Sequence, residues 1–316
     1  MKGMKTLAAA ACATALAFTL SACGARPLSE LYEQKAGGAV EVKVPADEKA
    51  KGVLDAVQAD PQLTELVPED IRATGIKMAN SVGYPPMELF ADNGKDILGV
   101  DPAIAAAIAK KLGIGFHIED QEFASMIPGM KSGRYNFVMS SMTDNKERRA
   151  QAFMVDYVKA GNAIQVSKGN PKGIKGPQDL CGQPVSTVQG GSSEARLKTF
   201  SKDCESKGKP AIKILGFSAD GEAGLAIKSG RSVASLTDYP PAADRAADPE
   251  SGFDAVEVSG GESIWGIAID NKNKPFAEAV QKALQSLIDD GSYGKILDAW
   301  SVDKLAIDKA TINGGD

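Results

Sequence analysis

Along most of this chain, short continuous apolar runs alternate with segments in which apolar residues are spaced three or four positions apart. This alternation predicts the secondary structure. From about residue 71 onward, runs such as Ile76–Ala79 and Phe137–Met139 have the length of buried strands. They alternate with segments in which apolar residues recur every three or four positions, as in Phe276–Asp289. Alternating strands and helices are typical of one fold class, so the pattern predicts an α/β fold.

The helix boundaries follow from capping residues. Asp101-Pro102 predicts a helix start, with Asp101 as the N-cap and Pro102 in the first turn, and Gly113 predicts the end of that helix. The Pro240-Pro241 pair and the stretch Asp244–Gly252 predict a surface loop. Further strands are expected at Ile114–Ile118, Val185–Val188, Ile212–Phe217, Ser232–Leu236 and Trp265–Ile269, and further helices at Met126–Lys131, Ser192–Phe200, Glu222–Ser229 and Tyr293–Trp300.

The N-terminus has the features of an export signal. Two lysines precede an apolar run from Leu7 to Leu20, which is shorter than the about 20 residues that span a bilayer. The sequence Leu20-Ser21-Ala22-Cys23 resembles a bacterial lipobox, so we expect residues 1–22 to be a lipoprotein signal peptide and Cys23 to be lipidated. An ordinary cleaved signal that carries a Cys is the alternative. Residues 23–70 lack a sustained apolar period and predict a lipid-anchored tether with one short helix near Glu48–Ala59.

Composition and charge narrow the possible partners. Removal of residues 1–22 takes away two lysines and no acid, which changes the formal charge from −5 to about −7. An acidic chain without a Lys/Arg-rich run argues against nucleic acid as a partner. Hydrophobic residues make up 43% of the chain, and no second long apolar stretch follows the signal, so we expect a globular domain outside the bilayer.

The cysteines and the single histidine limit the metal chemistry. With Cys12 lost in the signal and Cys23 lipidated, Cys181 and Cys204 remain, and two thiols in an oxidising compartment predict one disulfide. His117 is the only histidine and lies in an alternating, strand-like run, so no metal site is expected.

Four segments carry polar or aromatic residues where a ligand could bind. In the first, Ser140-Ser141 follows a strand, Asp144 and Glu147 predict a capping box, and Arg148-Arg149 lies near the start of the next helix. A cation near a helix N-terminus is destabilised by about 0.3–1 kcal/mol. An anion bound by these arginines would explain why they lie there. Solvated surface charges are the alternative.

The other three segments suggest the remaining contacts. Val188 ends a strand that leads through Gly190-Gly191 into Ser192, a layout suited to a small anion, although a purely structural turn fits equally. Asp238 ends another strand and could receive an ammonium group or simply form a turn. Tyr84, in a loop stiffened by prolines, and Phe123 belong either to the core or to a pair that clasps a side chain.

In this order the four segments resemble the family 3 extracellular solute-binding proteins, the amino-acid receptors of ABC importers. The resemblance runs from about Ile71 to the C-terminal Asn313-Gly314-Gly315, and its last elements together with the two cysteines look most like actinobacterial lipoprotein members. It is carried by Gly83-Tyr84-Pro85-Pro86, Leu98-Gly99-Val100-Asp101, the run Ile127–Tyr135, Met139–Asp144, Asp179-Leu180-Cys181-Gly182, Ser229-Gly230-Arg231 and Gly291-Ser292-Tyr293.

The resemblance implies a two-lobe periplasmic-binding-protein fold of type II, whose lobes are joined by two hinge strands and close on the ligand. Lobe 1 would comprise residues 71–159 and 263–316, and lobe 2 residues 160–262. The resemblance also implies that Arg148 binds the ligand carboxylate with help from Thr143 and Ser192, that Asp238 and the backbone at Ser141 hold the ammonium, that Tyr84 and Phe123 sandwich the side chain, and that Ser140 and Val188 complete the set.

One departure bears on the ligand. Receptors for basic amino acids place an Asp three residues before the Tyr84 equivalent, where this chain has Ser81, so we expect a polar uncharged or acidic amino acid. Burying a zwitterion requires both of its charges to be paired, and Arg148 and Asp238 fall in different lobes. The ligand would therefore shift an open–closed equilibrium toward the closed form, which docks on ABC permease subunits.

The expected protein is thus a monomeric, extracytoplasmic receptor without a cofactor, lipid-anchored to the outer face of the cytoplasmic membrane, and not an enzyme. Two alternatives remain open: an enzyme on the same scaffold, similar to cyclohexadienyl dehydratase, and a solute-sensor module that needs a signalling partner. For the enzyme, Glu88 and Asp92 are candidate general acids, but a loop with exposed charges explains both more simply.

Overall fold

Eight strands form one mixed sheet in the computed structural model, which describes residues 42–315. Their order across the sheet is β4-β1-β5-β10-β6-β9-β7-β8, and a separate two-stranded sheet pairs β2 with β3. The predicted signal peptide and Cys23 lie outside the described residues. The strands are β1 (Ile76–Asn80), β2 (Leu89–Phe90), β3 (Ile97–Leu98), β4 (Phe116–Asp120), β5 (Phe137–Val138), β6 (Ala152–Ser167), β7 (Pro184–Val188), β8 (Lys213–Phe217), β9 (Ala234–Asp238) and β10 (Phe253–Asp270).

Helices alternate with these strands, as the apolar spacing predicts. Helix α4 ends with Gly113 in the left-handed conformation, which only a residue without Cβ adopts at little cost. The helices are α1 (Lys51–Ala56), α2 (Pro61–Thr64), α3 (Glu69–Thr74), α4 (Val100–Leu112), α5 (Met126–Lys131), α6 (Lys146–Arg149), α7 (Ser192–Ser206), α8 (Asp220–Lys228), α9 (Tyr239–Ala247), α10 (Lys274–Asp289) and α11 (Ser292–Ala299), with 3₁₀ turns η2 (Phe123–Ser125), η3 (Pro177–Leu180) and η4 (Asp303–Leu305).

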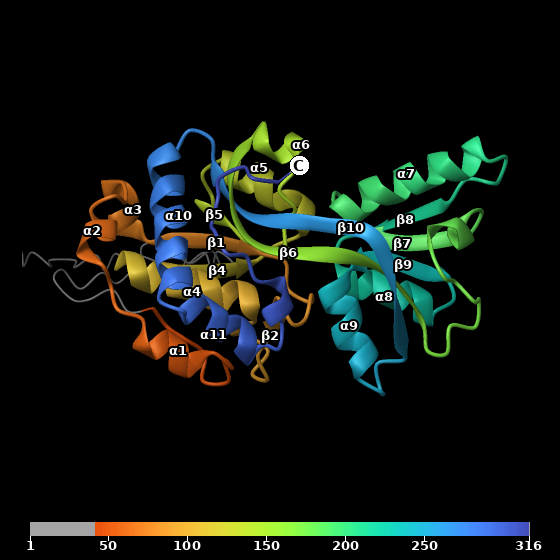
Figure 1. Ribbon diagram of the computed structural model, residues 1–316, viewed down its shortest axis with the longest axis horizontal. Coiled ribbons are helices and arrows are strands. Elements are labelled where there is room, and N and C mark those ends of the chain that lie inside the picture. The colour runs from red at the N-terminus through yellow and green to blue at the C-terminus, as the bar shows by residue number, and fades with distance from the viewer. Residues whose placement is uncertain (1–41, 316) are drawn as a thin grey trace, which may run out of the picture. The chain divides into compact units, whose positions relative to one another are not determined.

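Two long strands join two groups of parallel strands. In one group β1 pairs in parallel with β4 and β5, and in the other β7 pairs in parallel with β8 and β9. Strands β6 and β10 are antiparallel to each other along most of their length and run through both groups (Figure 1). The two-lobe α/β fold expected from the sequence is therefore present. The predicted lobe boundaries at 159–160 and 262–263 fall inside these two long strands and stay a prediction.

Each lobe has its own core. A large cluster that includes Trp265, Phe276 and Ile104 fills lobe 1, where α4, α10 and α11 pack against one another, and a smaller cluster lies on the other side of its strands. Another cluster around Leu197 and Ile164 fills lobe 2 between α7 and the strands. With separate cores, each lobe keeps its packing when the contacts between the lobes change.

The predicted tether is too long. Residues of α1 and α3, among them Leu54 and Ile71, are at most 3% exposed and belong to the lobe 1 core. Glu48 accepts hydrogen bonds from the Ala50 and Gly99 N–H groups and from the Trp300 indole at 2.7 Å, which fixes this segment to lobe 1. The expectation of a tether reaching residue 70 is wrong from residue 42 onward, because isolated apolar residues without a period find partners only in three dimensions.

Three local predictions also differ from the structure. Residues 239–247 form helix α9 rather than a loop, since Pro240 and Pro241 occupy its first turn, where their missing N–H groups cost nothing. Asp101 is not an N-cap: Gly99 precedes α4, and the Asp101 carboxylate accepts from the Ser141 N–H instead. The capping box is also absent, because Asn145 caps α6.

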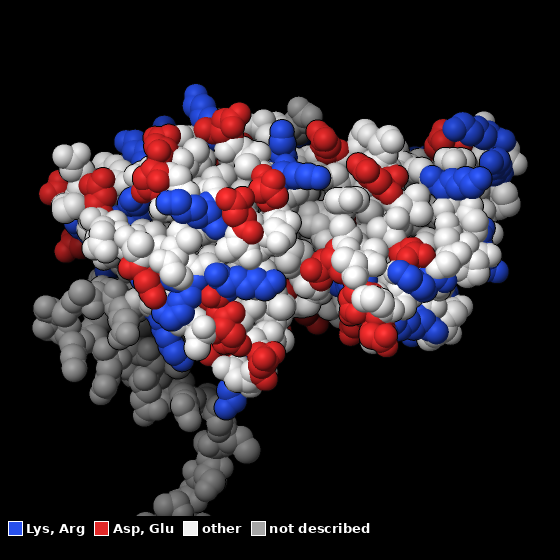
Figure 2. Space-filling view, turned by 60° about the horizontal axis from the view of Figure 1, so that its bottom comes forward, with Lys and Arg blue, Asp and Glu red and all other residues white. Residues whose placement is uncertain are grey.

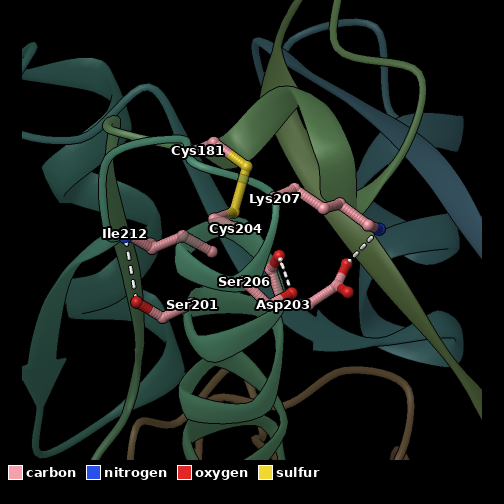
Figure 3. Close-up of a disulfide and its surroundings, with 7 residues drawn as sticks. All are labelled: Cys181, Ser201, Asp203, Cys204, Ser206, Lys207 and Ile212. Atoms are coloured by element: carbon pink, nitrogen blue, oxygen red, sulfur yellow. Dashed lines mark hydrogen bonds and ion pairs between the residues drawn. A yellow bond between two sulfur atoms is a disulfide. The ribbon is translucent and has the colours of Figure 1, made fainter.

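The predicted disulfide is formed. Cys181, just after η3, is bonded to Cys204 in the last turn of α7, as Figure 3 shows. Around it the Ser201 hydroxyl accepts from the Ile212 N–H at 3.0 Å, which ties the same helix to the start of β8. The disulfide therefore anchors the end of α7 that lies farthest from Ser192.

Replacement of both Cys181 and Cys204 by serine is expected to lower the free energy of unfolding by about 3 kcal/mol, because the bond closes a loop of about 24 residues in the unfolded chain. Denaturant-induced unfolding of the double variant and of the parent, each with and without reductant, measures the loss. The reduced parent is the matched control and should unfold like the double variant. A loss that stays below about 1 kcal/mol would contradict the prediction.

One face of the molecule shows how its charges are distributed (Figure 2). On the face drawn in Figure 2, basic and acidic side chains are interspersed, and no continuous basic stripe crosses it. Within residues 42–315, none of the helices has the length and apolar character needed to cross a bilayer.

Candidate functional site

The carboxyl ends of strands from both lobes meet at one cleft. Strands β1 and β5 of lobe 1 and β7 and β9 of lobe 2 all end there, which is where open α/β sheets bind ligands. The cleft encloses about 530 Å³ of empty space, counting its open mouth. Its lining comprises Ser81, Val82, Gly83, Tyr84, Glu88, Phe123, Ser140, Ser141, Thr187, Val188, Gly191, Ser192, Ser193, Asp220, Leu236, Thr237 and Asp238.

Tyr84 and Asp238 meet across the cleft. The Tyr84 hydroxyl donates to Asp238 Oδ2 at 2.7 Å and accepts from the Asp238 N–H at 3.1 Å. On the other carboxylate oxygen, Oδ1 accepts from Asn162 Nδ2 of the hinge strand β6 at 2.7 Å. Arg196 of α7 donates to Asn162 Oδ1 at 2.8 Å, so a chain of hydrogen bonds orients the Asp238 carboxylate.

The surroundings of the Asp238 carboxylate disfavour its ionised form. The side chain is almost fully buried, and burial raises its pKa to about 7, opposed by the Tyr84 hydrogen bond and by the charges of Arg148 and Arg196, while Asp220 raises it further. Within residues 42–315 no Lys or Arg forms a salt bridge with Asp238. A ligand ammonium group would supply the missing charge and favour the ionised carboxylate.

Arg148 is the matching buried cation of lobe 1. It is 7% exposed, and its guanidinium lies over the Phe123 ring at 5.3 Å and donates to the Thr143 carbonyl at 2.8 Å. It reaches lobe 2 through a longer hydrogen bond, 3.4 Å, to the Gly190 carbonyl. Burial lowers its pKa to about 10, a shift that the Asp238 charge opposes.

Within the described part of the chain, the Arg148 guanidinium has no anionic hydrogen-bond or salt-bridge partner. Its acceptors, the Thr143 and Gly190 carbonyls, are neutral, and among residues 42–315 no Asp or Glu forms a salt bridge with it. Buried charges in folded proteins are normally paired, and a guanidinium binds a carboxylate with two parallel hydrogen bonds. An anion of that shape is the chemistry that completes this part of the cleft.

A second contact across the cleft involves two hydroxyls. Thr143 Oγ1 donates to Ser192 Oγ at 3.0 Å, and Ser192 is the first residue of α7 after Gly190-Gly191. The first N–H groups of a helix have no partner within the helix and carry partial positive charge. Ser192 therefore adds a favourable field for an anion close to Arg148.

Glu88 is not an exposed loop charge, as the sequence suggested, but a buried residue of the cleft. It is 1% exposed and accepts from the Ser140 hydroxyl at 2.9 Å and the Ser141 hydroxyl at 3.5 Å. Its carboxyl lies against that of Asp101, and burial together with the Asp101 charge raises the Glu88 pKa well above its usual range. The raised pKa favours the protonated, neutral form of Glu88, which is a poor counter-ion for a cationic ligand group.

Asp101 is the second carboxyl residue of this pair. Burial raises its pKa to about 7, and its Oδ2 accepts from the Ser141 N–H at 2.8 Å and the Tyr157 hydroxyl at 2.9 Å. Ser141 has φ of 49°, a left-handed conformation that a non-glycine residue adopts at a cost. The carboxylate–amide bond compensates that cost and fixes the Ser140-Ser141 backbone at the cleft.

The structure brings most of the predicted site residues to one place. Seven of them line the cleft, namely Tyr84, Phe123, Ser140, Ser141, Val188, Ser192 and Asp238. Thr143 and Arg148 adjoin this lining through Ser192 and Phe123. Asp92 is exposed, as expected, and His117 lies in β4 away from the cleft lining.

Sequence reasoning missed several cleft residues of lobe 2. Asp220, the first residue of α8, lines the cleft and is paired with Arg245 of α9. Thr237 lies beside Asp238 and accepts from or donates to the Tyr84 hydroxyl at 3.1 Å. An acid at the start of a helix that follows a strand end was a usable signal for Asp220, but a helix-start preference explains such an acid equally well. No group of three potential metal ligands occurs within residues 42–315.

Comparison with known proteins places the chain among transport receptors. The model of the bacterial extracellular solute-binding proteins, family 3, matches residues 76–303. The arginine-binding protein ArgT of Corynebacterium glutamicum is 28% identical over 256 residues, which cover 80% of this chain and 83% of that protein.

Solved structures of the same kind are similar. An ancestral arginine-binding protein bound to arginine has a TM-score of 0.64 and 33% identity, covering 71% of this chain and 97% of the other. The structure of an ancestral arginine-binding protein bound to glutamine has a TM-score of 0.66 and 32% identity, covering 72% and 97%.

Proposed function

Because the chain belongs to the bacterial extracellular solute-binding proteins of family 3, we propose that its cleft binds one α-amino acid by both backbone charges and delivers it to an ABC permease. Its relatives are named as amino-acid-binding proteins, which supports a receptor rather than an enzyme. Release of the ligand unchanged would distinguish the receptor from a dehydratase on the same scaffold.

One observation carries this proposal: a buried, unpaired cation of lobe 1 and a buried, unpaired carboxylate of lobe 2 lie at the same cleft. Arg148 and Asp238 are close enough for each charge to shift the pKa of the other group. The ligand carboxylate would bind Arg148, Thr143 and the start of α7, and the ammonium would bind Asp238 and the backbone at Ser141. Since the two groups belong to different lobes, only a closed form pairs both ligand charges.

The charges around the cleft favour an uncharged polar side chain over an acidic one. Among residues 42–315, three carboxyl residues line the cleft and no Lys or Arg does, so an acidic side chain would lack a counter-ion there. A basic side chain would also lack one, because burial favours the neutral form of Glu88 and Asp220 is paired with Arg245. Ser81, Ser140 and Thr187 contribute hydroxyl groups to the lining. The Ser140 and Thr187 hydroxyls donate to Glu88 and to the Leu236 carbonyl, so they could meet a ligand only as acceptors. Glutamine is the simplest ligand of this class, in contrast to arginine.

Thermal unfolding of the full-length protein with each of the twenty amino acids tests the proposal. A ligand present at about a thousand times its dissociation constant stabilises the folded state by about 4 kcal/mol, which raises the melting temperature measurably. We expect a shift with glutamine or a similar uncharged polar amino acid, and a smaller one with arginine or glutamate. A protein that responds to no amino acid would refute the proposed function.

The remaining expectations concern the place of action. The family is extracellular, and we propose that lipid on Cys23 holds the protein at the outer face of the cytoplasmic membrane. Metabolic labelling with a radioactive fatty acid should mark the parent and not a Cys23→Ser variant. Equal labelling of the two proteins would refute the anchor.

A further inference from the structure

Arg245 lies behind the cleft and bonds to two of its lining residues. Its side chain is 14% exposed, and its Nη1 donates to Asp220 Oδ2 at 2.5 Å and to Gln165 Oε1 at 3.0 Å. Its Nη2 donates to the Gly83 carbonyl, in the lobe 1 loop that carries Tyr84, at 3.1 Å. One guanidinium therefore neutralises a carboxylate of lobe 2 and also bridges to lobe 1.

The partner carboxylate faces the site where the ligand would bind. Asp220 is 6% exposed, lines the cleft, and accepts from the Thr237 hydroxyl at 2.9 Å. Its charge acts on both Tyr84 and Asp238, which shows how near it lies to the center of the cleft. Without Arg245, Asp220 would be a buried carboxylate with no cationic partner. Such a carboxylate could bind a cationic ligand side chain.

We propose that Arg245 is a specificity-determining residue of this receptor: its guanidinium takes the place of a cationic ligand side chain against Asp220, so that the closed cleft selects amino acids without a positive side chain. The inference rests on the proposed function and adds to it the residue that sets the ligand class. A basic ligand would have to compete with an internal guanidinium that also holds Gln165 and Gly83.

The bridge to Gly83 links this selection to closure. Gly83 and Tyr84 come from lobe 1, whereas Asp220 and Arg245 come from lobe 2. When the lobes are together, the same side chain is held by acceptors from both of them. The salt bridge between Arg245 and Asp220 is thus favoured in the form that encloses the ligand.

The test compares Arg245→Gln with Arg245→Lys in the full-length protein, by calorimetric titration with L-glutamine and with L-arginine. For the parent we expect tighter binding of glutamine. In Arg245→Gln the affinity for arginine relative to glutamine should rise by about tenfold or more, since Asp220 gains a ligand partner. Arg245→Lys keeps the positive charge beside Asp220 and should stay close to the parent ratio.

A second variant keeps the test decisive if Arg245→Gln does not fold. Asp220→Asn preserves the shape of the side chain and leaves the Arg245 charge without its anion, so the affinity for L-glutamate relative to L-glutamine should rise by about tenfold. The inference is overturned if the folded variants keep the parent ratios, or if the parent prefers arginine to glutamine. In either case a parent that binds amino acids leaves the receptor function intact, whereas a parent that binds none refutes the proposed function itself.

Discussion

Changing Arg148 to alanine is expected to weaken amino-acid binding by about 2–5 kcal/mol while the protein stays folded. Among residues 42–315 the buried guanidinium has only neutral carbonyl acceptors, so its strongest interaction would be with the ligand carboxylate. Removing it leaves that carboxylate in a dry cleft without a counter-charge. Calorimetric titration gives the affinity, and the melting temperature of the unliganded protein gives the stability.

The matched control for this change is Arg134→Ala. Arg134 belongs to the same lobe and carries the same charge, but its side chain is 59% exposed and contacts Glu119 at 3.5 Å. Loss of an exposed pair of this kind should leave the affinity nearly unchanged. Arg148→Lys should recover part of the lost affinity, because it restores the charge but not the two parallel hydrogen bonds. If Arg148→Ala binds as tightly as Arg134→Ala, Arg148 does not bind the ligand.

Amino-acid affinity should fall as the pH is lowered through about 7, and Asp238→Asn should remove most of that dependence. Burial raises the pKa of Asp238 in the ligand-free protein to about 7. An ammonium ligand pairs with the ionised carboxylate and so lowers this pKa. Binding then releases a proton at low pH, and the affinity drops by up to about tenfold per pH unit below that point.

The sign for folding stability is the opposite. A carboxyl whose pKa is higher in the folded than in the unfolded protein takes up a proton more readily when folded, so Asp238 destabilises the ligand-free protein above about pH 7 and less so below it. Asp238→Asn should therefore stabilise the ligand-free protein at neutral pH although it weakens binding.

Calorimetric titrations of the parent and the variant from about pH 5 to about pH 8.5 measure the affinity, and thermal unfolding over the same range measures the stability. Asp101 and Asp156 also have pKa values raised to about 7 by burial, so the variant is needed to isolate the contribution of Asp238. Equal pH profiles for the two proteins would assign the dependence to those other carboxyls and remove the ammonium role from Asp238.

The longest strand pair shows where sequence reasoning stopped. Strand β6 (Ala152–Ser167) was not predicted as a strand from its residues, because Asp156, Lys159 and Asn162 interrupt any simple apolar period. It lies between β10 and β9 and is buried on both faces, so its polar residues find partners only in the assembled sheet. Asn162, for example, holds Asp238.

The sequence by itself determined the order of short strands and helices, the positions of the strand ends, and thereby most residues of the candidate site. These properties depend on local spacing, capping and the rule that ligands bind beyond strand ends. Asp238, Ser192 and Tyr84 were found in this way. The pairing of Cys181 with Cys204 followed instead from the number of cysteines left in an exported chain.

Only the tertiary structure decided which charges are available to a ligand. Arg148 and Arg149 are adjacent in sequence, yet Arg149 pairs with Asp144 while Arg148 faces neutral carbonyls. Glu88 and Asp220 look like any other acids in the sequence, but the folded chain brings Asp101 against the first and Arg245 against the second. Electrostatic partners are set by distance and burial, which the order of residues does not contain.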